Sequence, residues 1–231
     1  MKRLALVLAV ALLGACGDDP GNNDTGATTS TTHAAAPTTP TTLVSEEAQA
    51  AMWPAADVVF TTPEGAAKDF VSKVLDVPPT LGEFQRGDSR SGEINVFSPG
   101  EGGSDPIQRA TLVLRQLGPK NGWFVIAAGS DGVSITNLST GDKVAPGKVT
   151  VHGQGRGFEA NLVVSAYVAG DDVELTKVVT QGGSMGDTAP YNVTLDLSAA
   201  DRLTTVFVLV RGGTGLETDP GEFAAIPLKV V

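Results

Sequence analysis

The sequence predicts an α+β protein in two folded parts: a small domain with one helix packed on an antiparallel sheet, followed by an all-β sandwich. Residues 62–79 carry apolar side chains at helical spacing, between a capping signal and a pair of prolines. Later runs alternate apolar and polar residues and are separated by Gly and Asp turn signals. Aromatic residues make up only 5% of the chain, while Val, Thr, Gly and Ala dominate, which favours short strands and tight turns.

The helix is predicted to begin at Thr62. This residue suits the N-cap, Pro63 suits the first helical position, and Glu64 complements the positive end of the helix dipole. The apolar residues that follow lie on one face and form a stripe: Ala66, Ala67, Phe70, Val71, Val74 and Leu75. Residues 76–79, Asp-Val-Pro-Pro, are predicted to end the helix.

Three strand-like runs follow the helix, at residues 93–97, 110–117 and 123–128. Residues 118–122 form a hairpin loop with an Asn-Gly turn signal between the last two runs. Together with the helix, these runs predict a small α+β domain over residues 52–130. The turn cluster at 129–132 marks its end.

The rest of the folded part is predicted to be all-β. Seven strands are predicted, at residues 133–138, 149–155, 161–169, 173–180, 191–197, 204–211 and 224–231. Short strands in this number and spacing are typical of an immunoglobulin-like sandwich, which we predict over residues 131–231. Residues 206–210 are apolar at every position, which predicts a central strand covered on both faces.

The order of motifs in residues 131–231 resembles a known family. The motifs lie at 135–138, 141–147, 149–155, 158–162, 191–193 and 225–228. They are similar to the Gmad2 domain, an immunoglobulin-like module associated with sporulation and germination and found in exported bacterial proteins and lipoproteins. The resemblance implies an envelope-associated interaction module with no catalytic residues.

The N-terminus has the pattern of a signal peptide. Lys2 and Arg3 are basic, and residues 4–13 form an apolar run. This run is about ten residues long, whereas a bilayer-spanning helix needs roughly 20. The sequence therefore predicts a signal peptide over residues 1–15.

Leu-Gly-Ala-Cys at residues 13–16 resembles the bacterial lipobox. The resemblance implies cleavage before Cys16 and attachment of fatty acyl chains such as palmitate to its sulfur, often with acylation of the new α-amine. Cys16 is the only cysteine, so the chain has no intramolecular disulfide. Two or more acyl chains anchor a protein stably to a membrane. The predicted location is therefore extracytoplasmic, on the outer face of the cell membrane.

Residues 16–51 are predicted to be a disordered tether. From 17 to 42 there is no Val, Ile, Leu, Met, Phe, Trp or Tyr, and Thr, Pro and Ala are abundant. Such a segment cannot bury enough apolar surface to offset the entropy lost on ordering. It is expected to hold the folded part away from the membrane.

The charge of the chain argues against nucleic acid as a partner. The sequence has 16 basic and 26 acidic residues. Removal of residues 1–15 takes away Lys2 and Arg3 and leaves 14 basic residues against 26 acidic ones. A net negative chain of this kind is repelled by phosphate backbones and by anionic lipid headgroups.

One group of residues is predicted to rim a cleft for a ligand or partner. It consists of Trp53, Phe84, Arg86, Arg90 and Trp123. The alternative for Trp123 is ordinary core packing in a strand, and the alternative for Trp53 is a lid over the first domain. Both alternatives stay open from the sequence.

No residue pattern points to catalysis, a metal or a cofactor. His152, the only histidine in the folded part, is predicted to face outward on a strand. Residues 153–157 are rich in Gly but lie between strands, so they predict a tight turn or a β-bulge rather than a phosphate loop. Six acidic residues without an EF-hand pattern are predicted to be solvated loop carboxylates: Asp171, Asp172, Glu174, Glu217, Asp219 and Glu222.

The leading hypothesis is a lipid-anchored cell-envelope protein that acts as a non-catalytic binding or scaffolding module. Its partners are expected to be the membrane, reached through lipidated Cys16, and an exported protein or cell-wall material. The alternative is a carrier or sensor of a small hydrophobic ligand held in residues 52–130, which requires an apolar cavity there. An enzyme, the third class, requires convergent carboxylates with shifted pKa values.

Overall fold

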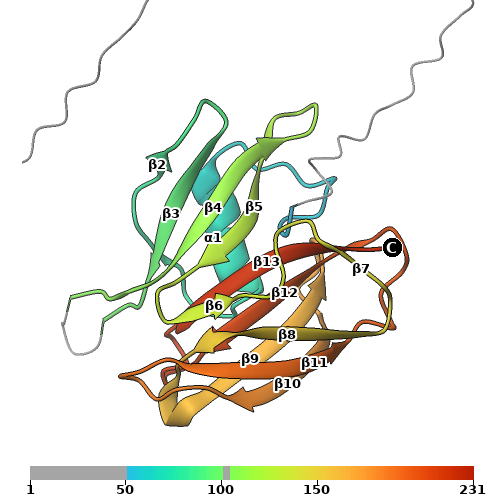
Figure 1. Cartoon of the computed structure of the whole chain (residues 1–231). Helices are drawn as coiled ribbons and strands as arrows, with labels where there is room; N and C mark the ends of the chain where they lie inside the picture. Colours follow the sequence, from blue (N-terminus) through green and yellow to red (C-terminus); the bar gives the residue numbers. More distant parts are fainter. Residues whose placement is uncertain (1–50, 101–104) are drawn as a thin grey trace, which may run out of the picture. The chain divides into compact units, whose positions relative to one another are not determined.

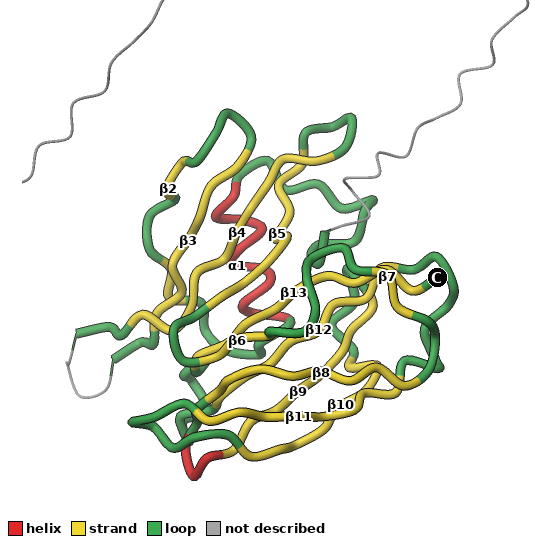
Figure 2. The backbone as a smooth tube through the Cα atoms, in the orientation of Figure 1, coloured by secondary structure: helices red, strands yellow, loops and turns green. Residues whose placement is uncertain are grey.

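The structure of the chain, a computed structural model, describes residues 51–100 and 105–231. The predicted signal peptide, Cys16 and all but the last residue of the predicted tether lie outside these residues. The described residues belong to one unit, 42–231, and form mostly antiparallel β-sheet with one α-helix (Figure 1, Figure 2). Within them, no helix is long and apolar enough to cross a membrane.

The helix α1 spans Pro63–Lys73 and begins as predicted. The Thr62 hydroxyl accepts a hydrogen bond from the Gly65 amide at 3.2 Å, which caps the first turn. The predicted apolar stripe is buried along its whole length: Ala66, Ala67, Phe70, Val71, Val74 and Leu75. Shortly after the helix, Asp76 adopts a φ of 53° and turns the chain away.

In the described part of the chain, thirteen strands follow α1: β1 (Thr80–Leu81), β2 (Gln85–Arg86), β3 (Ser91–Phe97), β4 (Gln108–Leu117), β5 (Gly122–Gly129), β6 (Val133–Ile135), β7 (Lys143–Val144), β8 (Lys148–Gly155), β9 (Asn161–Val168), β10 (Glu174–Gln181), β11 (Ala189–Asp196), β12 (Thr205–Gly212) and β13 (Glu222–Val230). Each of the ten predicted strands is present, with its ends shifted by a few residues. The sequence pattern does not predict β1, β2 and β7, because two residues are too few to show an alternation.

The strands form two sheets. The larger has ten strands, with the order β1-β3-β4-β5-β13-β12-β9-β10 along its main path, and the smaller has the order β11-β8-β6. Side chains of both sheets share one core cluster, in which Val151 and Leu195 from the small sheet lie with Val208 and Leu228 from the large one. The small sheet therefore covers one face of β9, β12 and β13.

The strand β12 is buried on both faces, as predicted from its apolar run. Val206, Val208 and Val210 belong to the core shared with the small sheet. Phe207 and Leu209 point to the other face and belong to the core beneath α1. Successive residues of a strand face opposite sides, so a strand with a cover on each side needs apolar residues at every position.

The core beneath α1 draws on both segments that were predicted as separate domains, 52–130 and 131–231. Phe207 of β12 lies 6.4 Å from Phe70 of α1, and it stacks on Tyr167 of β9 at 4.9 Å between ring centroids. The large sheet continues across the boundary through the pairing of β5 with β13. The division into two domains stays a prediction, but the two segments share a sheet and a core.

Candidate functional site

The structure brings only part of the predicted rim together. Phe84 packs edge-on against Trp123 with 5.2 Å between ring centroids. Trp53 and Trp123 are only 4% and 7% exposed and belong to the core beneath α1. Arg86 is exposed on β2, and Arg90 donates a hydrogen bond to a backbone carbonyl of β4 at 2.9 Å. Trp123 therefore packs in the core, which is the alternative stated for it from the sequence.

Trp53 is held in place from three sides. Its indole Nε1–H donates to the Asp69 carboxylate of α1 at 3.0 Å, and Lys73 Nζ lies 5.7 Å from its ring. Its backbone exchanges hydrogen bonds with Val125 of β5. Trp53 thus joins the helix to the sheet. Neither it nor the other predicted rim residues line the two cavities described next.

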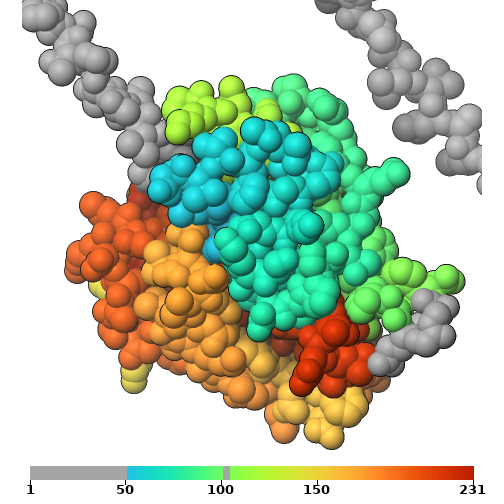
Figure 3. All heavy atoms as spheres, turned by 180° about the vertical axis from the view of Figure 1, so that it is seen from behind, coloured from blue at the N-terminus to red at the C-terminus, as the bar shows by residue number. Residues whose placement is uncertain are grey.

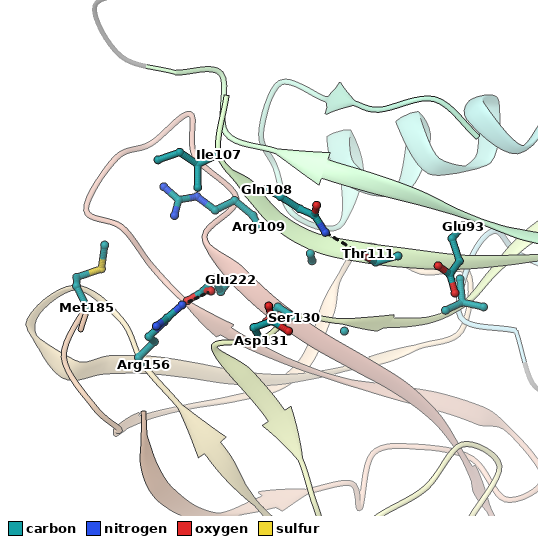
Figure 4. A pocket seen from close by; sticks show the side chains of 13 residues that line it. Glu93, Ile107, Gln108, Arg109, Thr111, Ser130, Asp131, Arg156, Met185 and Glu222 are labelled. Carbon is teal, nitrogen blue, oxygen red and sulfur yellow. Dashed lines mark hydrogen bonds and ion pairs between the residues drawn. The ribbon is translucent and has the colours of Figure 1, made fainter. Parts of the chain in front are cut away.

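A polar cleft of about 610 Å³ opens on the face of β3 and β4 (Figure 4). Its charged lining residues are Glu93, Arg109, Asp131, Arg156 and Glu222. In that order, these residues lie on β3, on β4, in the turn after β5, directly after β8 and at the start of β13. In Figure 4, Arg109 of β4 lies on one side of the cleft, and Arg156, Glu222 and Asp131 lie on the opposite side.

Arg156 is neutralised by Glu222. Its Nε and Nη2 donate to the two carboxylate oxygens of Glu222 at 2.6 and 2.8 Å. The hydrogen bond to Glu222 raises the pKa of Arg156 above its ordinary value. Gly132 passes beside this pair, and a side chain at that position would collide with both partners. The pair is therefore a fixed part of the wall.

Arg109 is neutralised in the same way by Asp219. Its Nε and Nη2 donate to the two oxygens of the Asp219 carboxylate at 3.0 and 2.6 Å. Asp219 is only 2% exposed and also accepts a hydrogen bond from the Gly221 amide. This pair ties β4 to the loop before β13.

Two carboxylates in the cleft form no ion pair within the described residues, although the charge of Asp131 acts on Arg156. The side chains of Glu93 and Asp131 make no hydrogen bond or ion pair with any residue that the structure describes, and both residues are exposed. Ile107 and Met185, which are 56% and 50% exposed, lie at the rim. The cleft thus offers surplus negative charge beside exposed apolar side chains, which suits a basic segment with an adjacent apolar residue.

A second cavity, of about 910 Å³, lies between the end of α1, the strands β9 and β10, and the loop after β12. Glu174 on its wall accepts hydrogen bonds from the hydroxyls of Ser165, at 2.8 Å, and Tyr167, at 3.2 Å, and pairs with Lys177. Burial alone would raise the pKa of Glu174, but the bonds from Ser165 and Lys177 outweigh it and lower that pKa. Burial raises the pKa of Tyr167.

The prediction of solvated carboxylates is wrong for two residues, Asp219 and Glu222, whose side chains are only 2% and 16% exposed. Both are paired with arginines that are distant in the sequence and that only folding brings to them. Glu174 is exposed as predicted, although it lies at the start of β10 and not in a loop. Asp172 and Glu217 are exposed, as predicted. Within residues 51–100 and 105–231, no group of three or more His, Cys, Asp or Glu side chains is placed to hold a metal ion.

Sequence reasoning did not single out Arg109, Glu93 and Asp131, and it placed Arg156 only in a turn. Arg109 and Asp219 are 110 positions apart, and Arg156 and Glu222 are 66 apart. No local spacing signals such pairs.

The comparisons with known proteins give no relative from which a function could be carried over. No family model matches the chain, and no curated protein or solved structure matches it.

Proposed function

We propose that the chain is a lipid-anchored cell-envelope protein whose folded part is a non-catalytic binding or scaffolding module. In this proposal Cys16 carries the acyl chains and residues 16–50 form the tether, because Ala51, the last residue of the predicted tether, is buried against Leu117 and Phe124. The polar cleft carries the function: it receives a basic segment of an exported protein. The observation that supports this most is the pair of carboxylates without an ion-pair partner, Glu93 and Asp131, beside two arginines that each pair with another carboxylate.

The fold supports an interaction module of the immunoglobulin-like type over residues 131–231. Two packed sheets with a shared core and short connections are the architecture that such a sandwich requires. In the proposal this segment is Gmad2-like. Clefts and loops held by a rigid sheet are common recognition surfaces.

The packing beneath α1 favours the binding module over the ligand carrier. Met52, Phe70, Leu112 and Leu114 are all 0% exposed and lie in the core between helix and sheet. A carrier of a hydrophobic ligand in residues 52–130 needs an apolar cavity where these side chains pack.

The anchor is tested by metabolic labelling of cells with an alkyne-bearing fatty acid. The wild-type chain is expected to take up label and to fractionate with membranes, whereas Cys16→Ala is expected to do neither. The physical reason is that Cys16 supplies the only thiol of the chain. Equal labelling of the two chains would disprove the anchoring proposal.

The cleft is tested by crosslinking in intact cells, with a photoreactive amino acid at Met185. The double variant Glu93→Gln/Asp131→Asn is expected to recover about fivefold less of the crosslinked partner, because two exposed charge pairs together contribute about 1 kcal/mol. Raising the salt concentration is expected to have a similar effect on the wild type.

The matched control removes the same charge elsewhere, by Asp57→Asn/Glu83→Gln, at exposed positions that do not line the cleft. This control is expected to recover the partner at the wild-type level. Equal losses in both double variants would show that net charge matters and the cleft does not.

A further inference from the structure

Arg211 of β12 is held by backbone carbonyls alone. Its Nε–H donates to the Pro220 carbonyl, its Nη1 to the Leu75 carbonyl at 2.9 Å and its Nη2 to the Asp219 carbonyl at 3.0 Å. A guanidinium has five N–H donors, so three bonds leave two donors unused. Within the described residues, no carboxylate pairs with Arg211. It differs in this respect from Arg109, whose partner is the carboxylate of Asp219 itself.

Arg211 is half-buried and has no ion-pair partner, although the charges of Asp219 and Asp76 act on it. Burial lowers the pKa of the Arg211 guanidinium below its ordinary value. Carbonyl dipoles orient the guanidinium and satisfy its donors, but they carry no net charge. Buried cations in proteins are usually paired with an anion, because an unpaired one is costly.

Arg211 lines the cavity of about 910 Å³ between α1, β9, β10 and the loop after β12. This volume lies within the range of small-molecule sites. The segments that border it meet on the face drawn in Figure 3, where the residues after α1 are blue-green, β9 and β10 light orange and the loop after β12 red. We name it the Arg211 cavity.

The other charged residues of the Arg211 cavity are paired or exposed. Lys73 pairs with Asp69, Lys177 pairs with Glu174, and the Asp219 carboxylate pairs with Arg109. The remaining lining residues with charge are exposed, where water and salt screen them: Asp76, Asp172 and Glu217. Of the described lining residues, Arg211 is thus the one cation without an ion-pair partner.

The cavity also contains a buried hydroxyl with no hydrogen-bond partner, that of Thr214. Buried polar atoms are usually bonded, so an unpartnered one marks a place for a missing partner. Apolar side chains complete the lining, among them Leu75, Val163 and Leu209. Leu216 and Val173, 40% and 68% exposed, extend this apolar surface outward.

We infer that the Arg211 cavity binds a small amphiphile with a single anionic headgroup, a carboxylate or a phosphate monoester. The headgroup accepts hydrogen bonds from the two unused N–H groups of Arg211 and from the Thr214 hydroxyl. The aliphatic part lies along Leu209, Val163 and the apolar residues beyond them. This site is separate from the polar cleft and goes beyond the proposed function.

The test is calorimetric titration of the full chain carrying Cys16→Ala, so that the protein has no acyl chains of its own. The probes are decanoate, decyl phosphate and decan-1-ol, each below its aggregation concentration. At least one of the two anions is expected to bind one site, at least tenfold more tightly than decan-1-ol. Comparison of decanoate with decyl phosphate tells which headgroup the cavity takes. Equal affinity for the alcohol and both anions would overturn the proposal.

Two variants assign the site. Arg211→Met is expected to weaken binding of the preferred anion at least tenfold and to leave decan-1-ol unchanged. Because Arg211 also holds three carbonyls, Thr214→Val provides a variant that removes no bond of the protein. It is expected to weaken anion binding about threefold to tenfold at an unchanged melting temperature. Thr61→Val, at an exposed position outside the cavity, is the matched control and is expected to bind like the parent. Unchanged anion binding in Thr214→Val would contradict the assignment even if Arg211→Met fails to fold.

Discussion

Replacing Asp219 with alanine is expected to lower the free energy of unfolding by about 3–5 kcal/mol. The carboxylate is 2% exposed and accepts two hydrogen bonds from Arg109 and one from the Gly221 amide. Its removal leaves the Arg109 guanidinium, whose side chain is 13% exposed, without a counter-charge. An unpaired buried cation costs far more than the net stabilisation that the intact pair contributes.

Urea denaturation followed by far-UV circular dichroism measures this effect. Glu217→Ala, in the same loop but exposed, is the matched control and is expected to change stability by less than about 0.5 kcal/mol. The double variant Asp219→Ala/Arg109→Met removes both charges and is expected to recover part of the loss. If Asp219→Ala were as stable as Glu217→Ala, the pair would contribute nothing to the fold.

The parts of the fold that the sequence predicts are those with a local physical cause. The Thr62 cap and the apolar stripe of α1 lie within 14 consecutive residues, and the predicted helix is present. The alternation in residues 191–197 likewise appears as the buried and exposed positions of β11. Such patterns depend only on the period of the backbone.

The parts that the sequence does not predict depend on long-range pairing. The large sheet continues from β5 to β13 through the pairing of Ala128 with Ala225, two small apolar residues that carry no signal of their partner. The same holds for the polar cleft, in which Arg156 and Glu222 meet only after folding. An acidic residue in a loop is therefore predicted from the sequence to be solvated, even where the folded chain pairs it with an arginine.

The tryptophans show a related limit. Trp53 and Trp123 are large and carry a polar N–H, so sequence alone leaves open whether they line a cleft or fill a core. The structure buries both, and Asp69 accepts the Nε1–H of Trp53, which removes the cost of burying that group. The hydrogen-bond partner of the indole N–H permits the burial of Trp53, and this partner, Asp69, is 16 positions away in the sequence.

Three arginines of the described part differ in the groups that accept their hydrogen bonds. Arg109 and Arg156 are each matched by a carboxylate in a two-bonded arrangement, so they stabilise the walls and have little charge left for a ligand. Arg211 is fixed just as firmly, but by neutral carbonyls. The polar cleft therefore presents carboxylates without ion-pair partners, and the second cavity presents a cation without one, next to exposed carboxylates. The two sites are expected to select ligands of opposite charge.

Replacing Phe207 with alanine is expected to lower the free energy of unfolding by about 3–5 kcal/mol and to do so for both segments at once. The ring is 0% exposed, stacks on Tyr167 and lies against Phe70 of α1. Truncation leaves a cavity in the core that the two segments share. Phe207→Leu, which keeps most of the volume, is the matched control and is expected to cost less than about 1.5 kcal/mol.

Comparison of the tryptophan fluorescence and circular dichroism transitions of Phe207→Ala distinguishes one cooperative folding unit from two. Both tryptophans of the chain, Trp53 and Trp123, lie in residues 52–130, whereas Phe207 lies in residues 131–231. If the segments unfold together, the tryptophan fluorescence transition of Phe207→Ala shifts to lower urea concentration by the same amount as the circular dichroism transition. Two independent domains would instead leave the fluorescence midpoint close to that of the wild type, because the mutation would destabilise only the segment without tryptophan. That result would establish the boundary near residue 130 as a domain boundary, and the shared core would then be an interface between two domains.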